Sequence, residues 1–287
     1  MMDADALVIR PLETQAELRA GEDLQRAVWG LDDREIIPDH IMLIVQRHGG
    51  LALGAFEPGG RLVGLLFGFL GVDYATPGHP WAHVSHVMGV LPEWQGRGVG
   101  YRLKLAQRAH ALRQGLNLVT WTYDPLESRN AALNIGKLGA ICRRYLRNLY
   151  GEMRDAINVG LPSDRFEVEW RLDAPRVLAR LEGTHRAPGL AAPDLCRANR
   201  VAWRADGLPV PEDPGVAWDG ARVALEIPAH FQQVRRADLA LAEAWRSHTR
   251  AHFEAAFAAG YAAVDFVSDV DEAGRRRSFY LLQPFSE

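Results

Sequence analysis

The chain has 287 residues, of which 48% are hydrophobic and 24% are charged, and its formal net charge is −3. This composition is that of an ordinary globular protein with one large domain or two smaller ones. The small net charge gives no electrostatic reason to expect a nucleic acid or an anionic membrane as partner.

Three further observations bear on the compartment. The only cysteines, Cys142 and Cys196, do not form a disulfide framework and indicate a reducing environment. The longest apolar run, Leu62–Val72, is too short to span a bilayer, and the acidic N-terminus lacks a secretory profile. We therefore expect a cytoplasmic protein.

The first 172 residues predict a mixed, mostly antiparallel sheet flanked by helices, which is an α+β fold. Thr14 and Glu17 have capping-box spacing and predict a helix that runs to Trp29. The segment "EPGGR" predicts a hairpin turn. The expected strands are 6–12, 51–56, 62–72, 82–90, 116–123, 140–150 and 166–172, and the expected helices are 15–29, 40–47, 99–115 and 128–138.

The rest of the chain predicts a helix and linker over 173–195 and a smaller α+β region over 196–287. A short helix, Pro175–Leu181, precedes the linker "EGTHRAPGLAAPD". We expect strands near 200–204 and 221–227, a helix over 237–257, and a hairpin of 261–268 with 278–282. This β-α-β order suggests a degenerate copy of the first part that closes the sheet or forms a homodimer face.

The segment "VLPEWQGRGVG" places three glycines between a strand and a helix. Backbone N–H groups of such a turn, together with the helix N-terminus, favour an anion, and glycine lets the ligand approach the backbone. The order differs from the P-loop, because Tyr101-Arg102 follows Gly100. It also differs from the dinucleotide-binding fingerprint Gly-x-Gly-x-x-Gly, because one residue and not two separates Gly98 from Gly100.

Gln95-Gly96-Arg97-Gly98-Val99-Gly100 resembles the acyl-CoA-binding motif of the GNAT acyltransferase superfamily, and the element order of 6–172 resembles it as well. The similarity extends to the later segment "SRNAALNIGKLGA". This resemblance implies that residues 95–100 hold the CoA diphosphate. It further implies that the pantetheine arm lies between the strands 82–90 and 116–123, near Met88, Val90 and Ser128.

His86 is the candidate general base for acyl transfer to an amine. It lies four residues before Val90, about 13 Å along a strand, and an imidazole suits proton transfer at neutral pH. A hydrogen-bonded structural histidine is the alternative. His83 and His86 would share a face on a helix, but on a strand they lie on opposite faces, so we expect no metal.

The resemblance leaves the general acid open. The family's tyrosine position corresponds to Ile135, so Tyr123, Tyr145 or Tyr150 would have to serve, unless the thiolate leaves unaided. For the acceptor, the resemblance points to the loop between the first two helices and to the late strands. The acceptor candidates are Trp29, Asp32, Asp33, His40, Arg143, Arg144 and Arg147, although solvated surface is the more common role for any single one of them.

These patterns favour an N-acyltransferase that moves an acetyl or succinyl group from acyl-CoA to a small-molecule amine such as an amino acid. A non-catalytic acyl-CoA sensor is the main alternative, and the missing tyrosine at Ile135 lends it weight. A dinucleotide-binding oxidoreductase is the third, which the glycine spacing disfavours.

Overall fold

The computed structural model describes residues 6–30, 34–74, 76–78, 80–153, 159–190, 192, 194–213 and 215–285. Contacts divide the chain into two compact units, one ending at Trp121 and the other beginning at Thr122. Each unit combines helices with a largely antiparallel sheet, so the expected α+β fold class is confirmed. Among the described residues, no helix has the length and apolar character needed to cross a membrane.

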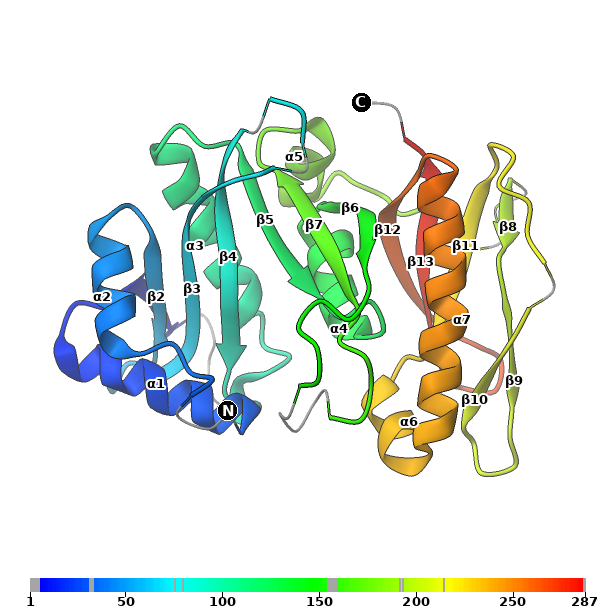
Figure 1. Cartoon of the computed structure of the whole chain (residues 1–287), viewed down its shortest axis with the longest axis horizontal. Helices are drawn as coiled ribbons and strands as arrows, with labels where there is room; N and C mark the ends of the chain where they lie inside the picture. Colours follow the sequence, from blue (N-terminus) through cyan, green and yellow to red (C-terminus); the bar gives the residue numbers. More distant parts are fainter. Residues whose placement is uncertain are drawn as a thin grey trace. The chain divides into compact units, whose positions relative to one another are not determined.

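The first unit is built on a sheet with the strand order β1-β2-β3-β4-β5 (Figure 1). Neighbouring strands are antiparallel from β1 to β4, whereas β4 and β5 are parallel. Its elements are β1 (Val8–Pro11), α1 (Gln15–Trp29), α2 (Asp39–Arg47), β2 (Leu51–Phe56), β3 (Leu62–Val72), β4 (Trp81–Val90), the 3₁₀ turn η2 (Pro92–Trp94), α3 (Val99–Arg113) and β5 (Leu118–Tyr123), whose last two residues belong to the second unit.

The predicted capping box starts α1 as expected. The Thr14 side chain accepts a hydrogen bond from the Glu17 amide, and the Glu17 carboxylate accepts one from the Thr14 amide, both at 3.2 Å. These contacts satisfy two of the donors that a helix N-terminus leaves without partners. The helix ends at Gly30, which has the left-handed φ of 65°.

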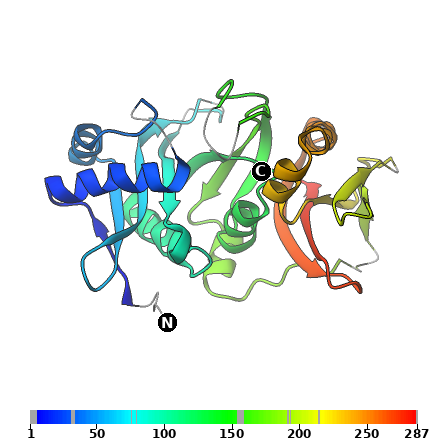
Figure 2. The same cartoon turned by 90° about the horizontal axis from the view of Figure 1, so that it is seen from below.

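Helices pack on both faces of the first sheet. On one face, Val99 and Leu103 of α3 lie so close to Gly64 that a Cβ there would meet them at 3.1 and 3.2 Å. Because side chains alternate along a strand, Leu65 of β3, next to Gly64, faces the opposite side of the sheet. Gly89 of β4 pairs with Leu65 and is covered by Trp29 of α1. The helices α1 and α3 therefore lie on opposite faces of the sheet (Figure 2).

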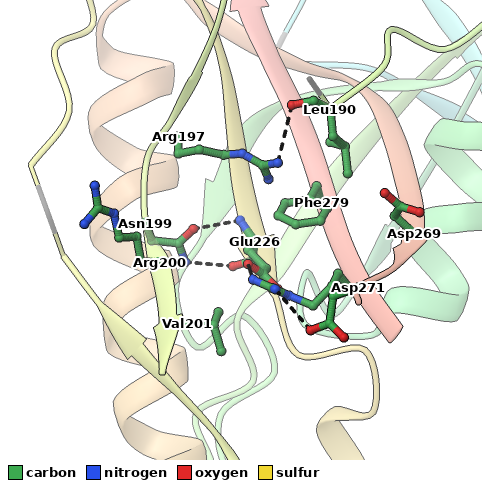
Figure 3. A pocket seen from close by; sticks show the side chains of 10 residues that line it. Leu190, Arg197, Asn199, Arg200, Val201, Glu226, Asp269, Asp271 and Phe279 are labelled. Carbon is green, nitrogen blue, oxygen red and sulfur yellow. Dashed lines mark hydrogen bonds and ion pairs between the residues drawn. The ribbon is translucent and has the colours of Figure 1, made fainter. Parts of the chain in front are cut away.

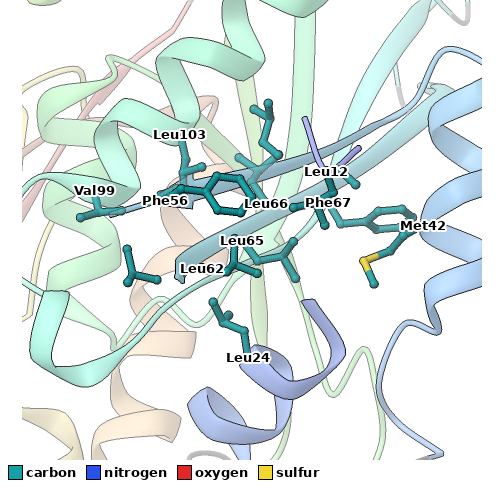
Figure 4. Close-up of a cluster of buried hydrophobic side chains, with 14 of the residues drawn as sticks. Leu12, Leu24, Met42, Phe56, Leu62, Leu65, Leu66, Phe67, Val99 and Leu103 are labelled. Atoms are coloured by element: carbon teal, nitrogen blue, oxygen red, sulfur yellow. The ribbon is translucent and has the colours of Figure 1, made fainter. Parts of the chain in front are cut away.

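The core of this unit is the apolar cluster in Figure 4. Leu65 and Leu66 are completely buried, and Met42 of α2 and Leu103 of α3 pack in the same cluster. The all-apolar β2 and the first half of β3 are buried on both faces, as expected for central strands covered by helices. This packing fixes the direction in which α3 leaves the end of β4.

The second unit contains two sheets, with the strand orders β7-β6-β12-β13-β11-β8 and β10-β9. Its remaining elements are α4 (Ser128–Ala131), the π-helix η3 (Ala132–Lys137), β6 (Ile141–Leu146), β7 (Arg165–Arg171), α5 (Pro175–Leu181), β8 (Leu195–Arg197), β9 (Arg200–Trp203), β10 (Pro209–Glu212), β11 (Arg222–Ile227), α6 (Phe231–Ala237), α7 (Leu239–Ala258), β12 (Tyr261–Val270) and β13 (Arg276–Pro284).

Two helical segments of this unit differ from the sequence expectation. The helix expected over 128–138 is wound as a π-helix from Ala132, with Leu138 donating to the Leu133 carbonyl. A separate helix, α6, precedes the expected long helix, because Asp238 adopts an extended conformation between them. The Asp238 side chain accepts from the Leu241 amide at 2.9 Å and caps α7.

The division into 1–172, 173–195 and 196–287 that the composition suggests stays a prediction. The hairpin expected around "DEAGR" is present, with β12 and β13 paired from Tyr261 to Val270. The strand β10 was not expected, because Pro209 and Pro211 interrupt its pattern. Proline is tolerated there because β10 belongs to a sheet of two strands, so each strand is an edge.

Candidate functional site

The strand β4 carries a bulge at His86. Phe67 of β3 pairs with Val87, whereas the next residue, Gly68, pairs with Ser85. His86 is therefore the extra residue on β4, and the ladder is interrupted at its position. A bulge bends its strand and redirects side chains, and such irregularities occur often beside active sites. The histidine chosen from the sequence thus lies at the local irregularity of its strand.

The His86 ring lies on the face of β4 that α1 covers. Its centroid is 6.4 Å from that of Phe67 and 5.8 Å from that of Phe69. These two phenylalanines of β3 face the side of the sheet opposite to the side that Gly64 and Gly68 face. The residue is exposed overall, yet the protein around the imidazole displaces water and lowers the pKa of His86. A neutral imidazole that solvent can reach is able to accept a proton.

The glycine turn after β4 has the conformation that its sequence predicts. Gly96 and Gly98 have φ values of 76° and 82°, and a Cβ built on either would meet no atom within 4 Å. Positive φ favours glycine, and the open space means that the backbone faces outward rather than into packed side chains. Gly98 is the N-cap of α3, so the first amides of that helix point toward the turn.

Side chains on both sides hold the turn in place. Val99 is buried in the apolar core and anchors the first residue of α3. The Gln95 side-chain amide donates to the Val90 carbonyl at 3.0 Å, which ties the turn to the end of β4. Arg97 is exposed, and its Nε donates to the Glu93 carbonyl at 3.0 Å. The turn is thus held in place, has open space at Gly96 and Gly98 and has a cation beside it, which fits an anionic group such as a diphosphate.

Parallel pairing between β4 and β5 is short. The paired residues are His83 with Val119 and Val84 with Thr120. Among the described residues of the first unit, β4 has no further pair with β5 from Ser85 onward, although β4 continues to Val90. Backbone groups on this edge of β4 can therefore bond to an extended ligand instead of a neighbouring strand.

A buried polar network lies on the opposite face of β4, beneath α3. Lys104 is 2% exposed, and its ammonium donates to Ser85 Oγ at 2.8 Å and to Gln107 Oε1 at 3.2 Å. The same ammonium lies 3.6 Å from the centroid of the Trp121 ring. Burial lowers the pKa of Lys104 well below its usual value.

His83 completes this network and is fully buried. Because Gln107 accepts from Lys104 through its oxygen, its Nε2 donates to His83 Nδ1, at 3.1 Å. The His83 ring therefore lies on the α3 face, away from His86, as the strand interpretation of "HVSH" predicts. Sequence reasoning missed the network; the one available signal was that Lys104 is one of only two lysines in the chain.

The acceptor candidates of the first unit occupy different places. Trp29, at the end of α1, lies over Gly89, where an added Cβ would approach its ring within 2.6 Å. Trp29 and His86 thus share one face of β4. His40 is an exposed residue at the start of α2, with its Nδ1 3.5 Å from Asp39. Asp32 and Asp33 lie outside the described residues.

The remaining candidates belong to the second unit. Ser128 Oγ donates to the Ala229 carbonyl at 2.7 Å, and Arg144 forms an ion pair with Glu167 at 2.6 Å. Arg143 is likewise paired with Glu169, and Arg147 with Glu254. These contacts give the arginines structural partners, and their roles toward a substrate stay predictions.

The tyrosines differ in accessibility. Tyr145 donates to the Asp164 carboxylate at 2.6 Å, and burial raises the pKa of Tyr145 well above its usual value. Tyr150 is exposed, and its hydroxyl lies 2.7 Å from Thr122 Oγ1. Tyr123 is buried, with its hydroxyl 3.0 Å from that of Tyr280. Ile135, at the family's tyrosine position, is completely buried in the π-helix. Of these phenols, only that of Tyr150 is exposed.

A pocket of the second unit is lined by opposite charges (Figure 3). Arg277 forms an ion pair with Glu226, and its Nη1 lies 3.5 Å from Asp271. The Arg197 guanidinium stacks 4.3 Å from the centroid of the Phe279 ring and donates to the Leu190 carbonyl. Because three arginines and three carboxylates line it, the pocket offers no strong preference for an anion or a cation.

Comparison with known proteins gives structural matches alone. No family model and no curated sequence matches the chain. Among solved structures, the chain is similar to the ribosomal-protein-S18-alanine N-acetyltransferase from Escherichia coli, with 16% identity, a TM-score of 0.44, and coverage of 58% of this chain and 95% of that one.

Two further matches are putative acetyltransferases. One, from Salmonella typhimurium, has 19% identity and a TM-score of 0.46 and covers 65% of this chain and 99% of its own. The other, from Acinetobacter baylyi, has 16% identity and a TM-score of 0.46 and covers 59% of this chain and 93% of its own. Identities this low do not assign a function to the chain.

Proposed function

We propose that the chain is a GNAT-type N-acyltransferase that transfers an acyl group from acyl-CoA to an amine. The observation that supports this most is the succession of bulged β4, outward-facing glycine turn and α3. In this succession, a glycine turn that would suit an anion lies at one end of a strand edge, and an imidazole lies farther back along the same strand. This arrangement suits a long, thin ligand that has a diphosphate at one end and a reactive group at the other.

In this proposal, residues Gln95–Gly100 hold the CoA diphosphate. Gly96 and Gly98 keep side chains away from it, and the Arg97 guanidinium adds positive charge. The β4 edge beyond Val84, including Met88 and Val90, provides backbone groups for the pantetheine arm. When bound, acyl-CoA supplies an activated thioester.

His86 is the proposed general base. Its lowered pKa keeps the imidazole neutral near pH 7, so that it can take the proton that the attacking amine must lose. Trp29, on the same face of β4, would position the acceptor. We propose a small-molecule amine such as an amino acid as acceptor and an acetyl or succinyl group as the acyl group.

The direct test is a thiol-release assay with acetyl-CoA and succinyl-CoA against a panel of amino acids and a short peptide. The proposal predicts acceptor-dependent release of free CoA with at least one pair. CoA binding without turnover on any acceptor would favour the alternative, a non-catalytic acyl-CoA sensor. That alternative draws on one specific observation, the buried Ile135 at the position where the family has a tyrosine. Failure to bind CoA would contradict both.

A further inference from the structure

Two histidines of α7 and an aspartate converge in the second unit. His248 and His252 are four residues apart on this helix and therefore share a face. Their ring centroids lie 4.7 Å apart. Asp213 follows directly on β10, and its carboxylate Oδ2 lies 3.6 Å from His252 Nε2. One ligand atom from each of the three residues lies within 4.8 Å of the other two.

The Nε2 atoms of His248 and His252 are both buried and make no hydrogen bond within the part of the chain that the structure describes. His252 is 7% exposed, so water does not readily satisfy its nitrogen. A buried polar atom without a partner costs free energy, and in a native protein it requires an explanation such as a bound ion.

A carboxylate beside the two imidazoles completes a set of three ligand atoms of the kinds that bind metal ions. The Asp213 carboxylate adds a negative charge, and its other oxygen is already oriented by the Gly215 amide at 2.8 Å.

The separation between the His252 and Asp213 ligand atoms fits zinc. Two ligands about 2.0–2.2 Å from a tetrahedral Zn²⁺ lie about 3.3–3.6 Å apart, and the observed separation of His252 Nε2 and Asp213 Oδ2 is 3.6 Å. Two imidazoles and one carboxylate suit zinc better than magnesium or calcium, which prefer oxygen ligands. Three protein ligands leave one tetrahedral position for water.

We propose that Asp213, His248 and His252 form a zinc site that fastens the β9–β10 hairpin to α7. Figures 1 and 2 show the hairpin beside this helix. A sheet of only two strands is marginally stable by itself, and the Trp245 indole already donates to the Pro209 carbonyl at 2.8 Å to hold it. The ion would add a second point of attachment at the end of β10. This site is independent of the proposed acyltransferase function.

The test is zinc binding by the full-length protein after chelator treatment and dialysis. Isothermal titration with Zn²⁺ should give one ion per chain, and zinc at about one hundred times its Kd should raise the Tm by about 5 °C. Asp213→Asn should weaken binding at least tenfold and reduce the rise in Tm to about half or less at the same zinc concentration, as should His252→Gln. Asp213 is exposed, so its variant keeps the test valid even if the buried histidine variant unfolds.

The matched control is Asp219→Asn. Asp219 also accepts a hydrogen bond from the amide two residues further on, at 3.4 Å from Ala221, but it lies outside the cluster. This variant should bind zinc like the wild type, and Mg²⁺ should not raise the Tm of either. Absence of zinc binding in the wild type, or binding that Asp213→Asn and His252→Gln leave unchanged, would overturn the proposal.

Discussion

His83 and His86 lie three residues apart on β4 and have opposite environments. His83 is completely buried beneath α3 and bonded to Gln107, whereas His86 is exposed on the other face beside Phe67 and Phe69. The same side chain can therefore serve as packing in one position and as a proton acceptor in the other. The two positions give two separate predictions.

The variant His86→Ala should lower kcat by about 10²–10⁴-fold while CoA affinity stays at the wild-type level, since general-base catalysis contributes a factor of that size. The matched control is His48→Ala, which removes an exposed histidine at the end of α2. Steady-state kinetics and CoA titration of both variants provide the measurement. A kcat for His86→Ala equal to that of the wild type would remove His86 from the mechanism.

The pH dependence of activity follows from the same residue. Because the pKa of His86 is lowered from its usual value of 6.5, the acidic limb of the kcat/KM profile should have an apparent pKa below 6.5. The base stays available as pH falls until that lower value is reached. The profile of His86→Ala should lack this limb, and an identical limb in the variant would assign it to another group.

The buried His83 leads to a prediction about how stability depends on pH. Burial, with the nearby His110 and Lys104, lowers the pKa of His83 to about 4, so the unfolded chain takes up a proton there before the folded one does. Stability is therefore lost as pH falls below 6.5 toward 4, by about 2 kcal/mol between about pH 7.5 and about pH 5. Urea unfolding at the two pH values should show a smaller loss in His83→Gln, and an equal loss would refute the assignment.

At the level of elements, the junction from β4 through the glycine turn to α3 carries the proposed coenzyme site. The sequence predicts this junction well because each of its signals is local: an apolar strand, glycines at positions that need positive φ, and an apolar helix face. The bulge at His86 was not predictable in the same way. It depends on the register with β3, where Gly68 gives the His83 ring room that a side chain would take away.

The variant Gly98→Val should abolish CoA binding. It forces a side chain into the open space before α3 and imposes a left-handed backbone that costs a β-branched residue about 1–2 kcal/mol. Gly115→Val is the matched control, because Gly115 lies just past the other end of the same helix, has a φ of 74°, and also faces open space. CoA titration should show a loss of affinity for Gly98→Val and none for Gly115→Val. Equal losses of affinity in the two variants would mean that backbone strain alone causes the effect.

The second unit illustrates which contacts escape sequence reasoning. Arg246 of α7 forms a buried ion pair with Asp124, which is 122 residues away in the chain. Asp213, which follows the second strand of the β9–β10 hairpin, likewise lies next to His252 of α7. Partners this distant come together only through the fold, and no spacing rule marks them. The same holds for Ser85 and Lys104 in the first unit.

At the scale of the whole molecule, the two units have separable proposed roles. The first contains the strand edge and turn that suit acyl-CoA, and the second contains the charged pocket and the proposed zinc site. The element order of the first unit could be predicted almost residue by residue, because hydrophobic periodicity and turn residues determine it. The second was predicted less completely, because its short strands and proline-containing hairpin carry weak local signals.

The central claim is that backbone amides of Gln95–Gly100 hold the diphosphate of an acyl-CoA. A crystal structure of the protein with acetyl-CoA tests it most directly. We predict diphosphate oxygens within hydrogen-bonding distance of the amides of this turn, with the acyl end along β4 near His86. Electron density for the coenzyme at any other place, with the turn bound to nothing, would contradict the account.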